Sequence, residues 1–184
     1  KKSEKYFGMI PNPINIDKLK YINAEKSKKI NILHAINSKN KLKKGNKFFE
    51  ESLRVIEKKY FSKIKIIRTY DVSYEDHIIN VRNCDIILDQ VYAYDQGYNA
   101  LEAMALGKVV FSGAEKEWCK FYNIKEDTVI INALPDIQKI IDKLAWLIEN
   151  PIHIRLISKN ARKFVVKHHN YIEISKKYEK AWIK

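Results

Sequence analysis

The chain has 184 residues, a formal net charge of +13 and a hydrophobic content of 46%. This length and apolar content predict one globular domain with its own core and exclude a disordered chain. No apolar run reaches the roughly 18 residues of a membrane-crossing helix, and the opening residues lack the apolar stretch of a signal peptide. Cys84 and Cys119 form no disulfide or metal-binding pattern, which favours a reducing, cytoplasmic compartment and predicts no metal site.

The excess of basic residues has three interpretations. Nucleic-acid binding is disfavoured because only five of the 35 basic residues are arginine, the residue that makes bidentate contacts to bases and phosphates. The charge is also uneven, since residues 66–112 contain three basic and seven acidic residues. A lysine-rich composition explains much of the excess, and peripheral contact with an anionic membrane stays open as a functional alternative.

The order of elements indicates an α/β fold. Residues 1–29 form a lead-in segment with two prolines in the run IPNPINID. Short apolar runs predict strands at Ile30–Ile36, Lys63–Arg68, Asp85–Asp89, Val109–Ser112 and Thr128–Ile131. Helical spacing and caps predict helices at Asn46–Lys59, Tyr74–Asn83, Asn99–Leu106, around Glu115–Tyr122, at Pro135–Asn150, from Pro151 to about His168, and at Tyr171–Ile183.

Alternating strands and helices predict a parallel sheet built from βαβ units. We therefore expect one Rossmann-like domain over residues 1–184, with about five parallel strands between helices and a helical C-terminal tail over residues 170–184. Ligands of such sheets bind beyond the carboxyl ends of the strands. The loops that reach this edge are Asn37–Asn46, Thr69–Ser73 and Gln90–Asn99.

The first two of these loops have a structural and a functional interpretation each. Lys39, Lys41 and Lys44 precede Gly45 at a strand-to-helix junction, where ammonium groups could bind a diphosphate. A solvated, charged loop is the alternative. In the second loop, Tyr70 and the backbone at Val72 could border a nucleobase, although a turn followed by a helix cap explains the same residues.

The third loop leads into an apolar helix. Gly97 precedes Asn99, which is expected to cap the helix and to place Glu102 in its first turn. A helix N-terminus directs free N–H groups and the positive end of its dipole at a phosphate. Gly97 would allow the backbone to approach a ligand closely, and Glu102 could hold ligand hydroxyls. The spacing of Asn99 and Glu102 also fits a capping box, which would be a purely structural role.

The helix and the strand after it also carry a family resemblance. The run ALEAMALGKVV, residues 100–110, closely resembles the LEAMACGKPV segment of two-domain (GT-B) glycosyltransferases, particularly the retaining family 4. Lys44 and Gly45 resemble the Lys-Gly pair of that family at the first strand-to-helix junction, and Lys41 or Lys39 matches the basic residue before it. The lead-in IPNPINIDKL resembles the segment that joins the two domains of such enzymes.

The resemblance implies the C-terminal domain that binds the nucleoside-diphosphate-sugar donor. Glu102 would hold the ribose hydroxyls, and Lys44 with Lys41 or Lys39 would neutralise the diphosphate. Backbone N–H groups around Tyr98, Asn99 and Ala100 would contact phosphate or sugar. No cofactor or metal is expected. An N-terminal acceptor-binding domain, expected to lie outside this chain, would be the partner, and the catalytic residues on the acceptor side stay unknown.

One position departs from the family pattern. The family has a second glutamate eight residues before the helix glutamate, and this chain has Tyr94 there with Asp95 beside it. Asp95 could take over the contact with the donor sugar in a shifted register. Two alternatives stay open for the function: a sugar-nucleotide epimerase or phosphorylase of the same fold, and a basic module that binds membrane or nucleic acid.

Overall fold

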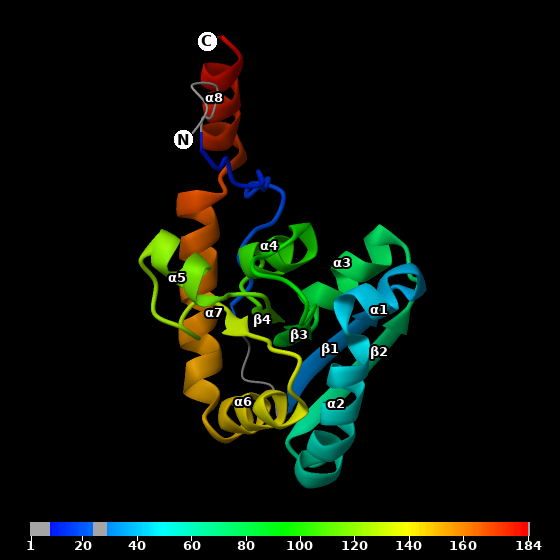
Figure 1. The fold of residues 1–184 in the computed structure, drawn as a ribbon. Helices are drawn as coiled ribbons and strands as arrows, with labels where there is room; N and C mark the ends of the chain where they lie inside the picture. Colours follow the sequence, from blue (N-terminus) through cyan, green and yellow to red (C-terminus); the bar gives the residue numbers. More distant parts are fainter. Residues whose placement is uncertain (1–7, 24–28, 184) are drawn as a thin grey trace.

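A five-stranded parallel sheet forms the centre of the molecule (Figure 1). The computed structural model describes residues 8–23 and 29–183. The strands, in the order β2-β1-β3-β4-β5, are β1 (Ile30–Ile36), β2 (Ile64–Tyr70), β3 (Ile86–Leu88), β4 (Val109–Ser112) and β5 (Ile131–Asn132). The predicted class, the parallel sheet and the alternation of strands and helices are confirmed. No helix in the described part of the chain is long and apolar enough to span a membrane.

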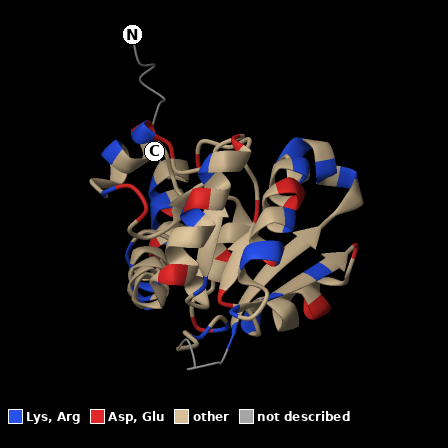
Figure 2. Cartoon of the chain, turned by 90° about the horizontal axis from the view of Figure 1, so that it is seen from below, with Lys and Arg blue, Asp and Glu red and all other residues tan. Residues whose placement is uncertain are grey.

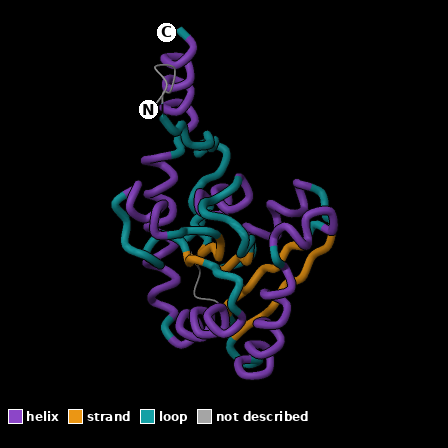
Figure 3. Tube along the Cα trace, in the orientation of Figure 1, coloured by secondary structure: helices purple, strands orange, loops and turns teal. Residues whose placement is uncertain are grey.

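The helices surround the sheet (Figure 3). They are α1 (Lys41–Lys44), α2 (Asn46–Tyr60), α3 (Tyr74–Arg82), α4 (Tyr98–Ala105), α5 (Lys116–Tyr122), α6 (Ile137–Glu149), α7 (Pro151–His168) and α8 (Tyr171–Trp182). The predicted helices are all present. The first loop, which was predicted to be irregular, contains a 3-10 turn at Ser38–Asn40 and the short helix α1.

Both faces of the sheet are covered by helices, which explains why the strands read as continuous apolar runs. Ile87 and Val110 point into a core shared with α3, α4 and α5. Ile86 and Phe111 point to the opposite face, into a core shared with α2 and α6. Helix α7 contributes buried residues to both cores. The sheet is thereby fixed between two apolar layers, and its polar chemistry is restricted to the edges.

The described part of the lead-in segment is attached to the C-terminal helices. The N–H of Ile14 donates to the carbonyl of His169 at 2.7 Å, and the N–H of Tyr171 donates to the carbonyl of Ile14 at 3.2 Å. The Arg162 guanidinium of α7 donates to the carbonyls of Ile16 and Leu19. After this junction α8 projects away from the sheet (Figure 1), and Ile174 is its only buried residue.

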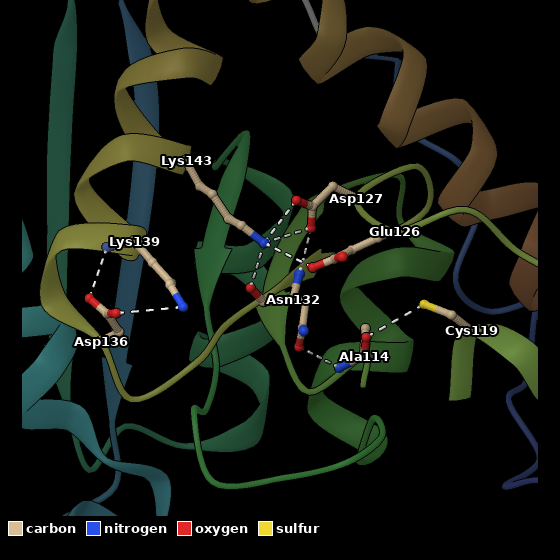
Figure 4. A network of polar contacts seen from close by, with 8 residues as sticks. All are labelled: Ala114, Cys119, Glu126, Asp127, Asn132, Asp136, Lys139 and Lys143. Carbon is tan, nitrogen blue, oxygen red and sulfur yellow. Dashed lines mark hydrogen bonds and ion pairs between the residues drawn. The ribbon is translucent and has the colours of Figure 1, made fainter. Parts of the chain in front are cut away.

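The last strand is shorter and later than predicted, because the segment before it turns. Asp127 has a positive φ of 58°, and its carboxylate accepts the N–H of Asn132 at 2.9 Å. Lys143 of α6 binds the same carboxylate at 2.8 Å. Asn132 in turn accepts the N–H of Ala114 at 3.0 Å (Figure 4). This polar network joins β5 to the end of β4 and to α6.

Candidate functional site

A crevice of about 320 Å³ lies at the carboxyl ends of β1 and β2. Its floor comes from the last residues of the two strands, including Ala35 and Thr69. The first loop contributes Asn37, Asn40 and Lys44 to its walls, the second contributes Asp71, Val72 and Ser73, and the helices contribute Tyr74, His77 and Asn99. The first two loops that the sheet topology singles out, and the start of the helix that follows the third, therefore meet at one cavity.

Behind the crevice lies a buried carboxylate, that of Asp89 directly after β3, which contacts two of the lining residues, Lys44 and Asn99. Asp89 is 3% exposed. Its Oδ1 accepts hydrogen bonds from Lys44 Nζ and from Asn99 Nδ2, each at 2.7 Å. Its Oδ2 accepts the Ser112 hydroxyl at 3.1 Å. The carboxylate thus fixes Lys44 from the first loop and Asn99 from the third loop in one arrangement.

A second series of contacts joins α3 to α4. Because the Asn99 amide nitrogen faces Asp89, its oxygen faces His77 and accepts a hydrogen bond from Nε2 at 2.5 Å. One turn away, the hydroxyl of Tyr74 donates to Glu102 Oε1 at 3.0 Å. Burial raises the pKa of Glu102, and the Tyr74 hydrogen bond and the nearby His77 oppose this shift. Glu102 lies beside the crevice, behind Tyr74, rather than on its wall.

The predicted cap of α4 is wrong by two residues. Gly97 is the N-cap residue, the helix begins at Tyr98, and no side chain caps it. Asn99 therefore lies inside the first turn, and Glu102 is the fifth residue of the helix, so the pair forms no capping box. The N–H groups of Tyr98, Asn99 and Ala100 donate to no acceptor among the described residues. The capping-box explanation of Glu102 is thereby removed, and its structural contact is the hydrogen bond from Tyr74. The end of the helix is free for an anion.

The first and second loops are joined by Asp71. Its carboxylate accepts the Ser38 N–H at 2.8 Å and the Ser38 hydroxyl at 2.6 Å, and these hydrogen bonds lower its pKa. Asp71 itself has a positive φ of 49°. The predicted cap of the next helix is confirmed, because Ser73 accepts the N–H of Asp76 at 3.1 Å.

The predicted site residues fall into two groups. Lys44, Val72 and Asn99 line the crevice. Among the others, Ala100 is buried in the core, Gly97 and Glu102 are partly buried, and the exposed side chains are those of Lys39, Lys41, Tyr70, Tyr94, Asp95 and Tyr98. None of these exposed residues lines the crevice, and Asp95 lies within electrostatic reach of Tyr122 and His169.

The sequence reasoning missed three polar residues of the site. Asp89, Tyr74 and His77 were not among the predicted site residues. Asp89 had a usable signal, because it directly follows a buried strand and a carboxylate there is costly unless it is paired. Tyr74 and His77 lie one turn apart on α3, and only the packing of α3 against α4 shows that they face the site.

Comparison with protein families identifies the chain. The model of a family described as "Glycosyl transferase-like" matches residues 29–180. The chain belongs to this family. A comparison with curated proteins gave no match. The family assignment therefore rests on the family model, and it agrees with the resemblance of residues 100–110.

Solved structures show where this glycosyl transferase-like fold occurs. The C-terminal domain of a group 1 glycosyl transferase family protein, LpcC from Francisella tularensis, matches with TM-score 0.61 at 20% identity, over 85% of this chain and 98% of that one. Sucrose-phosphate synthase from Thermosynechococcus elongatus matches with TM-score 0.70 at 17% identity, over 94% of this chain and 51% of that one. Anabaena Alr3699/HepE, solved in complex with UDP and glucose, matches with TM-score 0.68 at 13% identity, over 94% and 56%.

These matches confirm the fold as that of the C-terminal domain of group 1, GT-B glycosyltransferases. The chain spans about half of the sucrose-phosphate synthase and HepE chains, whereas it spans nearly all of the isolated LpcC domain.

Proposed function

We propose that the chain is the donor-binding domain of a glycosyltransferase and binds a nucleoside diphosphate sugar at the crevice. The observation that carries the proposal is the uncapped N-terminus of α4 beside Lys44, both held by Asp89. Free N–H groups, a helix dipole and an ammonium group together suit a diphosphate. The solved complex of Alr3699/HepE with UDP and glucose supports the ligand class.

Lys44 can serve the ligand and the fold together. Its ammonium group has three N–H donors, and Asp89 accepts one of them. The other donors remain for a phosphate, because Lys44 lines the crevice. Lys39 and Lys41 are exposed on the same loop and add positive charge near the crevice. The lysines and the α4 N–H groups would stabilise the diphosphate as it leaves the sugar, which is electrostatic catalysis.

Glu102 is the proposed contact for the ribose hydroxyls. Tyr74 occupies only one of its carboxylate oxygens, so the second can accept hydrogen bonds from a ligand. Val72 and the neighbouring backbone remain the proposed border of the nucleobase, since Val72 lines the crevice. Asp95 is the proposed substitute for the family's second glutamate.

The acceptor is proposed to bind to an N-terminal domain that closes the crevice. Exposed aromatic side chains lie next to residues that line the crevice, Tyr70 beside Asp71 and Tyr98 beside Asn99 among them, and exposed aromatic surface is typical of interfaces. The chain alone is therefore expected to bind nucleotide while transferring sugar poorly. Efficient sugar transfer by the 184 residues alone would disprove this division of roles.

Titration calorimetry tests the ligand class. A panel of nucleoside diphosphates and the corresponding nucleosides is titrated into the wild type, into Glu102→Gln and into the double variant Lys44→Gln/Asp89→Asn. The double variant removes both charges of the pair, so that no lone buried carboxylate is left beside the crevice. Glu117→Gln is the matched control, because Glu117 is exposed on α5 and carries the same charge.

We expect at least one diphosphate to bind. Glu102→Gln should weaken binding about tenfold, because a hydrogen bond to a charged group contributes roughly 1.5–3 kcal/mol. The double variant should bring the affinity for the diphosphate close to that for the nucleoside, and the control should bind as the wild type does. If no diphosphate binds, or if Glu102→Gln binds equally well, the assignment of the site fails.

A further inference from the structure

The outer face of α7 carries an unusual combination of side chains. The helix buries Ile154, Ile157 and Phe164 against the cores. The side chains on the opposite side recur at helical spacing and are exposed. They are Ile152, Arg155, Leu156, Lys159, Lys163 and Val166. We refer to these six residues as the outer face of α7.

The charge on this helix has a single sign. None of the 18 residues of α7 is acidic. Arg155, Lys159 and Lys163 form no ion pair with any carboxylate in residues 8–23 or 29–183. In α2, by contrast, lysines alternate with acidic residues, as in the pair Lys47–Glu51 at 3.7 Å. Lysine and arginine occur over much of the molecular surface (Figure 2), but α7 presents them without compensation.

Aliphatic side chains lie between these cations. Ile152 is 50% exposed, Leu156 49% and Val166 38%. A nucleic-acid backbone would attract the cations but would give these aliphatic groups no apolar partner. A lipid interface accommodates both kinds, because aliphatic groups enter the boundary of the acyl chains while basic groups remain with the headgroups. Clustered basic residues next to anionic lipids each contribute about 1 kcal/mol.

We propose that the outer face of α7 docks the domain on an anionic lipid surface. Helix α7 runs along one side of the molecule, and α2 and β2 lie on the other side (Figure 1). The crevice lies at the ends of β1 and β2, so a membrane on α7 leaves the crevice accessible. The inference uses no residue of the proposed nucleotide site, and its test is independent of nucleotide binding.

Co-sedimentation with vesicles tests the proposal. The 184-residue chain is mixed with vesicles of phosphatidylcholine alone and with vesicles that also contain phosphatidylserine. The test variant is Arg155→Gln/Lys159→Gln/Lys163→Gln. The matched control is Lys58→Gln/Lys63→Gln/Lys65→Gln, which removes the same charge from exposed positions at the end of α2 and the start of β2. Leu156→Ser tests the apolar contribution at constant charge.

The wild type should bind the anionic vesicles, and added salt should weaken that binding. The α7 triple variant should bind about a hundredfold more weakly, since three cations at about 1 kcal/mol each are lost. The control triple variant should lose less than about tenfold, because its cations are distant from the contact and salt screens them. Leu156→Ser should weaken binding several-fold.

Three results would overturn the proposal. One is equal binding to neutral and anionic vesicles. Another is an equal loss in the two triple variants, which would mean that net charge rather than α7 determines binding. The third is tight, salt-dependent binding to DNA that Leu156→Ser leaves unchanged while vesicles are not bound, which would identify a nucleic-acid surface instead.

Discussion

Two helices begin at the same edge of the sheet, each after a glycine, and their N-termini differ. Gly45, before α2, has a φ of 69°, and a Cβ there would lie 2.3 Å from Val91 Cγ2. Gly97, before α4, has a φ of −82°, and a Cβ there would meet no atom within 4 Å. The first glycine is required by the backbone and by packing. The second is required by neither, so the start of α4 keeps open space that the proposed ligand could occupy.

The largest expected effect on stability is at Gly45, where the start of α2 is closely packed. Gly45→Ala should lower the free energy of unfolding by about 3 kcal/mol, because left-handed backbone costs an L-residue roughly 1–2 kcal/mol and overpacking costs a similar amount. Urea denaturation followed by circular dichroism measures the change. A loss below about 1 kcal/mol would show that Val91 and Tyr92 move aside easily, which would weaken the contrast between the two glycines.

A comparable effect is expected from the ion pair that links the two loops. Lys44→Ala would leave the buried Asp89 carboxylate without its cation, at a cost of roughly 3 kcal/mol. Asp89→Asn in the same chain should recover most of that loss, since the amide needs no counter-charge. Urea denaturation of Lys44→Ala and of Lys44→Ala/Asp89→Asn measures the difference between their free energies of unfolding. Equal stability of the two would mean that Asp89 is not charged in the folded protein.

The stability of the core beneath α2 should also depend on pH, through His34. This histidine of β1 is fully buried, and its ring packs edge-on against Phe49 of α2. Burial lowers its pKa to about 4. The unfolded chain therefore takes up a proton first as the pH falls from about 7 to about 4, and stability decreases, by up to about 3 kcal/mol for this group.

His34→Phe provides the comparison for that pH dependence. Other histidines with lowered pKa, such as His169, contribute equally to both proteins, so the difference between the two stability curves reports His34. The variant should lose less stability than the wild type between pH 7 and pH 4. Parallel curves would show that His34 is not held in its neutral form.

The smallest effect on stability is expected at Gly97, where the start of α4 has open space beside it. Gly97→Ala should lower the free energy of unfolding by only about 0.5–1 kcal/mol, because glycine is preferred over alanine at a helix N-cap while neither backbone strain nor packing opposes the added methyl group. Thermal denaturation measures this change, with Gly45→Ala as the opposite extreme. A loss as large as that of Gly45→Ala would mean that Gly97 is a structural glycine after all.

The contrast between these regions also shows which parts of the structure can be predicted from sequence. The inner strands were found because Ile86 and Val109 begin runs that are buried on both faces, and such runs leave a clear apolar signal. The cap of α4 was misplaced because Asn99 and Glu102 fit the pattern of a capping box, while the actual cap, Gly97, uses no side chain.

The buried polar contacts of the site could not be predicted from the sequence for a different reason. Asp89 binds Lys44, 45 positions before it, and Asn99, ten positions after it. Pairings over such separations depend on the order of strands in the sheet and leave no local periodicity. The position of Lys44 in the crevice was predicted, but its partner could be identified only once β1, β3 and α4 were placed together.

The central claim is that the open N-terminus of α4 receives the diphosphate of a nucleotide. The most direct measurement is the affinity of Gly97→Val for a nucleoside diphosphate and for the corresponding nucleoside, by calorimetry, with a cooperative thermal transition as the check that the variant is folded. The extended backbone of Gly97 accepts valine, and the side chain would occupy the open space. The account predicts at least a tenfold loss for the diphosphate and little change for the nucleoside. Unchanged affinity for the diphosphate in a folded variant would contradict it.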